Sequence, residues 1–193
     1  MPTSDFQSLP PDLPEPIDDG AADHLPGLEL PALALPSTLG GTIELAAAAR
    51  AVGTLVLYVY PRTGVPGQPS PDGWDAIPGA RGCTPQSCAF RDHHAELQAL
   101  GAEVLGLSAQ SAEEQREFAT REHIPFALLA DPDLQVAHAL ELPTFEVEGM
   151  RLYKRITLIV RGNAIVKAFY PVFPPDRNAA EVLGWLQSSG DAR

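Results

Sequence analysis

A continuous run of β-favouring apolar residues limits what this chain can fold into more than any other feature. Residues 53–60 read Gly-Thr-Leu-Val-Leu-Tyr-Val-Tyr, and Pro61 follows at once. A strand with one face in water alternates apolar and polar side chains, whereas a strand buried on both faces reads as an unbroken apolar run. The run therefore predicts a central strand in a sheet covered on both faces, and a chain of 193 residues is long enough to build one.

Strand and helix patterns alternate around this run. Ser111 and Glu114 form a capping-box pattern at the start of one helix, and Gly162-Asn163 joins the last two strands as a hairpin turn. We expect edge strands at 28–30 and 42–45, strands at 102–108, 126–130, 155–160 and 164–170, and helices at 46–51, 85–100, 111–122, 132–140 and 178–187. This order predicts an α/β fold with a central mixed sheet and helices on both faces.

Two segments fit neither pattern. Residues 1–36 hold eight prolines, seven acidic residues and no Lys or Arg. We expect residues 1–23 to be an acidic, proline-rich, disordered leader, and residues 24–193 to form one domain. Residues 62–79 hold four prolines and four glycines and predict an extended loop, in which Trp74 is one anchored point.

Charge and hydropathy exclude several classes of protein. The chain has 25 acidic against 13 basic residues and a net charge of −12, which disfavours binding to nucleic acid or to an anionic membrane surface. Its longest apolar runs, 55–60 and 156–160, are too short to span a bilayer. Residues 1–6 have neither the basic region nor the apolar core of a signal peptide. We expect a cytoplasmic protein without a nucleic-acid or membrane partner.

The two cysteines, Cys83 and Cys88, lie where the buried strand has ended and a helix begins. Pro85 suits the first turn of that helix, which places Cys83 at its start. Free N–H groups and the helix dipole stabilise a thiolate there, and Arg81 lies close in sequence. Cys88 lies a turn and a half further along the helix, so the helix dipole stabilises its thiolate less.

The spacing of the cysteines constrains a disulfide between them. Residues five apart in a regular helix have Cα atoms about 8.6 Å apart, whereas a disulfide needs about 4.4–6.8 Å. A bond between Cys83 and Cys88 therefore requires residues 82–90 to unwind. In a reducing compartment such a pair is more often catalytic or sensing than structural, although two small buried residues remain an alternative.

Other candidate sites are weak. The chain has five histidines (His24, His93, His94, His123 and His138), but no Cys or His lies at zinc-finger spacing. No glycine-rich phosphate loop is present. We therefore expect no metal site.

One stretch resembles a known family. It reads Gly82-Cys83-Thr84, three further residues, and then Cys88-Ala-Phe-Arg-Asp92, after an earlier Tyr60-Pro61. This pattern is similar to the peroxiredoxins, and most of all to the peroxiredoxin Q group, also called bacterioferritin comigratory protein. Matching segments follow at 104–108, 125–133 and 155–159, so the resemblance covers residues 25–188.

The resemblance implies a thioredoxin-like fold and a thiol peroxidase that reduces hydrogen peroxide and organic hydroperoxides. By position, Cys83 matches the peroxidatic cysteine, Cys88 the resolving cysteine, and Arg155 the arginine that holds the thiolate and the peroxide. The sulfenic acid on Cys83 would condense with Cys88 to a disulfide, which thioredoxin or a similar dithiol would reduce. The group needs no cofactor and is often monomeric, so we expect a monomer.

The chain departs from the family motif Pro-x-x-x-Thr-x-x-Cys. Ala80, three residues before Cys83, has no hydroxyl, and Ala76 stands where the motif proline would be. We expect substrate to be positioned by Gly82, Thr84, Thr63 and Pro61, the last as counterpart of the motif proline, with the hydroxyl of Thr63 or Thr84 replacing the missing one. Two alternatives stay open. One is a non-enzymatic redox sensor, which Ala80 favours, and the other is a thiol–disulfide oxidoreductase, whose usual spacing is Cys-x-x-Cys.

Overall fold

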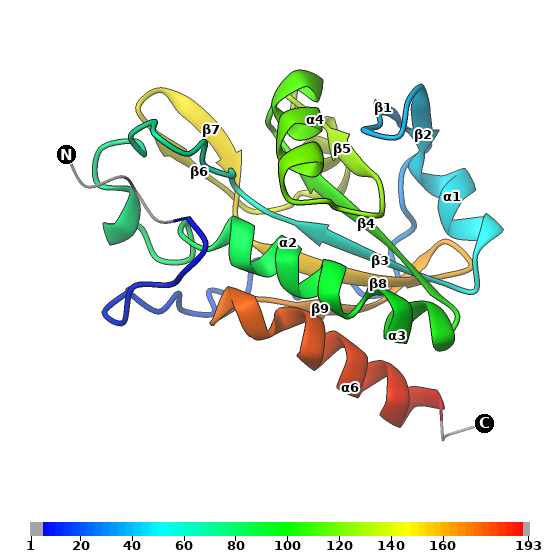
Figure 1. Cartoon of the computed structure of the whole chain (residues 1–193). Coiled ribbons are helices and arrows are strands. Elements are labelled where there is room, and N and C mark those ends of the chain that lie inside the picture. Colours follow the sequence, from blue (N-terminus) through cyan, green and yellow to red (C-terminus); the bar gives the residue numbers. More distant parts are fainter. Residues whose placement is uncertain (1–5, 191–193) are drawn as a thin grey trace.

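A five-stranded mixed sheet forms the centre of the molecule, whose computed structural model describes residues 6–190 (Figure 1). The strand order is β5-β4-β3-β8-β9. β3 runs parallel to β4 and antiparallel to β8, and β4 runs parallel to β5. The strands are β3 (Thr54–Val59), β4 (Ala102–Ser108), β5 (Leu128–Ala130), β8 (Ile156–Arg161) and β9 (Ala164–Phe169).

Helices cover both faces of this sheet, as the sequence predicts. Every residue of β3 is buried, because its alternate side chains enter two separate cores. Leu55, Leu57 and Val59 face α1 (Leu45–Ala51) and α5 (Gln135–Leu140). Val56 and Tyr58 face the opposite core, with α2 (Cys83–Asp92), α3 (His94–Ala99), α4 (Ala112–Arg121) and α6 (Asn178–Gly190). Within residues 6–190, none of the helices is long and apolar enough to cross a membrane.

Several expected boundaries are wrong. The helix expected at 85–100 is divided into α2 and α3 by His93, whose backbone (φ −93°, ψ 4°) ends the first and starts the second. The strand expected at 28–30 is reduced to a single bridge between Glu29 and Ala164. α5 begins three residues later than expected, and the Asp131 carboxylate caps it by accepting from two backbone N–H groups.

Two short sheets lie beside the central one. β1 (Ala34–Pro36) pairs with β2 (Thr42–Glu44). β6 (Thr144–Val147) and β7 (Met150–Tyr153) form a hairpin that the sequence pattern did not predict. Glu148 and Gly149 both have positive φ in its two-residue turn, the conformation that such hairpins favour. Two 3₁₀ turns complete the structure, η1 (Trp74–Ala76) in the long loop and η2 (Pro175–Arg177) before α6.

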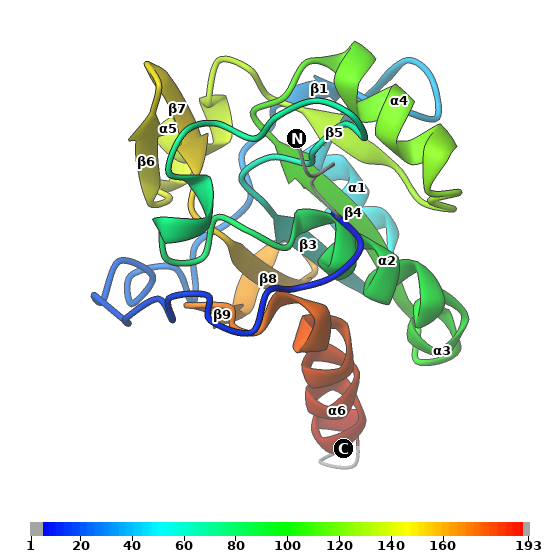
Figure 2. The same ribbon diagram turned by 60° about the vertical axis from the view of Figure 1, so that its left-hand side comes forward.

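The leader is placed against the domain over residues 6–23, although we expected it to be disordered. It contains no helix or strand, and Figure 2 shows it, in dark blue, crossing in front of the start of α2. Side-chain partners account for this course. Asp19 pairs with Lys154 at 2.9 Å and accepts a hydrogen bond from Tyr170 at 2.8 Å, and Ala22 is buried in a core. Residues 1–5 of the expected leader lie outside the described residues.

Candidate active site

Cys83 is the first residue of α2 and is buried. The chain reaches it through Gly82, whose φ of +106° is a conformation that side chains other than glycine rarely adopt. A Cβ atom on Gly82 would lie 2.3 Å from Cγ of Pro175 and 2.8 Å from Cδ2 of Leu9. Two constraints therefore require glycine at position 82: its positive φ, and the close approach of Pro175 and Leu9 to its Cα.

The side chain of Arg155 contacts the sulfur of Cys83. It directly precedes β8, its side chain is buried, and its Nη2 lies 3.3 Å from Sγ of Cys83. Nη1 donates to Oε1 of Gln86 at 2.5 Å. Nη2 also donates to the backbone oxygens of Gly79, Ala80 and Arg81 at 3.2, 3.1 and 3.1 Å. These oxygen acceptors are uncharged, so the guanidinium charge is directed at the sulfur, where it favours a thiolate and any developing oxyanion.

A second set of buried polar residues fixes this arrangement. Gln86 donates through Nε2 to Oδ1 of Asn178 at 3.0 Å, and Thr157 donates to the same oxygen at 2.7 Å. All three side chains are fully buried, so the network ties α2 to β8 and α6. The sequence analysis did not find Gln86 or Asn178. Gln86 was detectable in principle, since a residue three positions after Cys83 shares its helix face.

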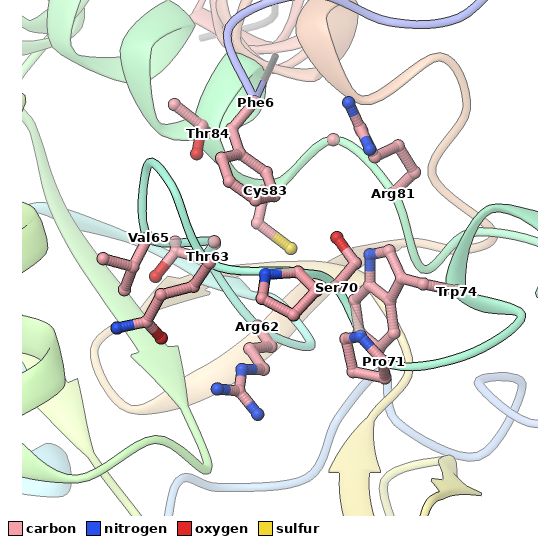
Figure 3. Close-up of a pocket in the computed structure, with 14 residues that line it drawn as sticks. Phe6, Arg62, Thr63, Val65, Ser70, Pro71, Trp74, Arg81, Cys83 and Thr84 are labelled. Atoms are coloured by element: carbon pink, nitrogen blue, oxygen red, sulfur yellow. The ribbon is translucent and has the colours of Figure 1, made fainter. Parts of the chain in front are cut away.

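Cys83 opens onto a small pocket with a free volume of about 30 Å³ (Figure 3). Three of the four residues expected to position substrate line it, namely Gly82, Thr84 and Thr63. Pro61 is not among the lining residues. It follows β3 directly, and its carbonyl oxygen accepts a hydrogen bond from Ser108 on the next strand, which keeps it at the end of the sheet.

The two candidate hydroxyls differ in their bonding. Thr63 donates through both its backbone nitrogen and its hydroxyl to Oε1 of Gln110, at 2.8 and 3.0 Å. Oγ1 of Thr84 is buried and has no hydrogen-bond partner within the part of the chain that the structure describes. A buried hydroxyl without a partner costs free energy unless a ligand or water satisfies it. Of the two hydroxyls, only that of Thr84 thus has a free bonding capacity within residues 6–190, although the oxygen itself is buried and would meet a peroxide only after a local opening.

Cys88 has a different environment five residues further along α2. It is half-buried, and its Sγ lies 3.7 Å from Oε2 of Glu122. Burial raises the pKa of Cys88 to about 11, with a smaller opposing effect from Arg91 and a further increase from the Glu122 carboxylate. Cys88 is thus a thiol at neutral pH. Both cysteines are free, and both lie in the regular helix.

Comparison with known proteins identifies the family of this chain. The family model described as Redoxin matches residues 25–183. The chloroplastic peroxiredoxin Q of Sedum lineare is 33% identical over 135 residues, which cover 69% of this chain. The chain spans 63% of that relative, so less than two thirds of its length.

Solved structures have the same fold. The peroxidoxin BcpB of Mycobacterium tuberculosis has a TM-score of 0.69 at 24% identity, over 86% of this chain and 98% of that one. A bacterioferritin comigratory protein of Xanthomonas campestris, solved for insight into its alkyl peroxide reduction activity, has a TM-score of 0.64 at 26% identity. That match covers 85% of this chain and 98% of the other. The thioredoxin-like fold expected from the sequence is confirmed.

Proposed function

Because the chain belongs to the redoxin family, we propose that it is a thiol peroxidase that reduces hydrogen peroxide and organic hydroperoxides through Cys83. The contact between Nη2 of Arg155 and Sγ of Cys83, at 3.3 Å beside the Cys83 pocket, carries this proposal. The alkyl peroxide reduction activity named for the Xanthomonas relative supports the substrate class.

The first step is oxidation of Cys83. Its thiolate attacks the terminal oxygen of the peroxide, so that an S–O bond forms while the O–O bond breaks. Cys83 becomes a sulfenic acid, and the leaving oxygen takes a proton from water to give an alcohol, or water when the substrate is hydrogen peroxide. Arg155 and the hydroxyl of Thr84 stabilise the charge that develops on the departing oxygen.

The second step is resolution by Cys88. Its thiol loses a proton and its sulfur attacks Cys83, so that an S–S bond forms and the sulfenic oxygen leaves as water. The two residues are five apart in α2, so the first turns of this helix must unwind before the bond can form. A thioredoxin-type dithiol then restores both thiols by exchange.

A redox sensor built on the same cysteine pair is the second candidate function. Ala80 lacks the hydroxyl of the family motif, and the raised pKa of Cys88 slows formation of the disulfide. The first feature favours slow oxidation of Cys83 by peroxide. The second favours a long-lived sulfenic acid on Cys83, as a sensor requires. A thiol–disulfide oxidoreductase is less well supported, because its usual spacing is Cys-x-x-Cys.

We also propose that the protein is a cytoplasmic monomer. A cycle that depends on a dithiol reductant operates in a reducing compartment, which supports the location. The plant relatives are chloroplastic proteins, so the group occurs in more than one such compartment. Sedimentation equilibrium and localisation of a tagged chain test the two statements separately.

A coupled turnover assay tests the peroxidase. The chain is mixed with thioredoxin, thioredoxin reductase and NADPH, and NADPH oxidation is followed after peroxide is added. We expect oxidation that depends on peroxide and that is lost in Cys83→Ser and in Cys88→Ser. A wild-type chain that is oxidised once and then not turned over would support the sensor instead.

A further inference from the structure

The ring of Phe6 lies over the Cys83 pocket. Phe6 is one of the residues that line it, and Figure 3 shows its ring in front of Cys83. The Arg81 guanidinium lies 5.5 Å from the ring centroid. A Cβ atom on Gly64 would lie 2.1 Å from Cε1 of Phe6, so the ring packs against the bare backbone of the long loop.

The residues that follow Phe6 hold it in this position. Gln7 donates through Nε2 to both carboxylate oxygens of Glu122, each at 3.0 Å. Leu9 approaches Gly82 so closely that a Cβ atom there would lie 2.8 Å from its Cδ2. The leader is thus attached on both sides of the entrance, at the end of α4 and at the start of α2.

The remaining space is small. Trp74, Pro71 and Ser70 of the long loop also line the pocket, whose free volume is about 30 Å³. One water molecule needs about 10–15 Å³ measured in this way. The space beside Cys83 therefore holds a molecule of the size of water or hydrogen peroxide, and an alkyl or aryl group there would have to point out of the pocket or displace the ring of Phe6.

We propose that Phe6 is a specificity-determining residue, which lets hydrogen peroxide reach Cys83 and slows bulky organic hydroperoxides until the ring moves aside. The inference deepens the proposed thiol peroxidase function and rests on it. Phe6 restricts access to Cys83 by its size, and it takes no part in the reaction of the thiolate with the peroxide.

Stopped-flow oxidation of the reduced protein tests this selectivity. Second-order rate constants are measured with hydrogen peroxide and with cumene hydroperoxide for the wild type, Phe6→Ala and Gly64→Ala. The last variant displaces the ring from the other side, and Gly64 does not need positive φ, so its backbone accepts alanine. Ile17→Ala is the matched control, because Ile17 lies in the same leader and is 85% exposed.

The expected result is a change in the ratio of the two constants. We expect both ring-displacing variants to raise the cumene hydroperoxide constant about tenfold relative to that for hydrogen peroxide, the size of a typical steric discrimination. Ile17→Ala keeps the wild-type ratio. An unchanged ratio in both variants, or an equal increase for both peroxides, would overturn the inference. Failure of the wild type to react with hydrogen peroxide would instead reject the peroxidase itself.

Discussion

Nη2 of Arg155 lies 3.3 Å from Sγ of Cys83, although 72 residues separate them in the sequence. The same nitrogen donates to three consecutive carbonyl oxygens, at residues 79–81, that lead into α2. One guanidinium therefore fixes the loop that ends at Cys83 and presents its charge to the sulfur. This contact joins the sheet to the start of the helix that carries both cysteines.

Replacement of Arg155 by lysine tests the planar geometry of this contact. An ammonium group cannot reach Gln86, the backbone oxygens and the sulfur together, because it lacks the fork of the guanidinium. We expect Arg155→Lys to lower the second-order rate constant with hydrogen peroxide about 10²- to 10³-fold. Arg151→Lys is the control, since Arg151 is exposed and pairs with Glu146 on the neighbouring strand of the β6–β7 hairpin. A rate within threefold of wild type in Arg155→Lys would contradict the role.

Two threonine variants distinguish the candidate hydroxyls. Thr84→Val removes a buried hydroxyl that has no partner within residues 6–190, so it deletes a contact to the peroxide at little structural cost. We expect its rate constant to fall about 10²-fold, by analogy with other oxyanion donors. Thr63→Val loses a hydrogen bond to Gln110 and is expected to lower the free energy of unfolding by about 1 kcal/mol at a nearly unchanged rate. The reverse pattern would identify Thr63 as the substitute for the motif threonine.

The sequence predicts the sheet and its covering helices better than the details around the site. The apolar run that became β3 and the capping box of α4 are local signals, and both are present in the structure. The position of Arg155 beside Cys83 has no local signal, and only the family resemblance indicated it. The division of the expected helix at His93 was missed because the apolar spacing continues across the break.

The leader shows the limit of composition as a guide. Its prolines and acidic residues predict disorder, yet Phe6, Gln7 and Asp19 each meet a specific partner on the domain. Such pairings depend on the folded surface of the domain and cannot be read from the leader itself. The same holds for Glu122, which was not singled out in the sequence and contacts both Cys88 and Gln7.

The pKa of Cys88 gives a prediction on pH. In a Cys83→Ser background, alkylation of Cys88 should follow a midpoint near pH 11, because burial and the Glu122 carboxylate both disfavour its thiolate. Glu122→Gln removes that negative charge, so it should lower the pKa and increase the alkylation rate at pH 8–9. Glu113→Gln, an exposed carboxylate in the first turn of α4, is the control. A midpoint that rises or stays constant in Glu122→Gln would contradict the electrostatic contact.

Oxidation should unwind the first turns of α2. Both cysteines lie in this helix in the reduced state, at a spacing too long for a disulfide. We expect amide hydrogen exchange of residues 83–90 to increase in the disulfide form, while α4 (Ala112–Arg121) keeps its protection. Equal protection of α2 in both forms, with the disulfide shown by mass, would mean that the bond forms without unwinding.

Rapid mixing of the reduced protein with hydrogen peroxide tests the central claim most directly. Trp74 lines the same pocket as Cys83, so we expect its fluorescence to change on oxidation, and Trp185→Phe removes the signal of the other tryptophan. The account predicts a rate constant orders of magnitude above that of free cysteine, retained in Cys88→Ser and abolished in Cys83→Ser. A rate equal to that of a free thiol, or one unaffected by Cys83→Ser, would contradict the assignment of Cys83 as the peroxidatic residue.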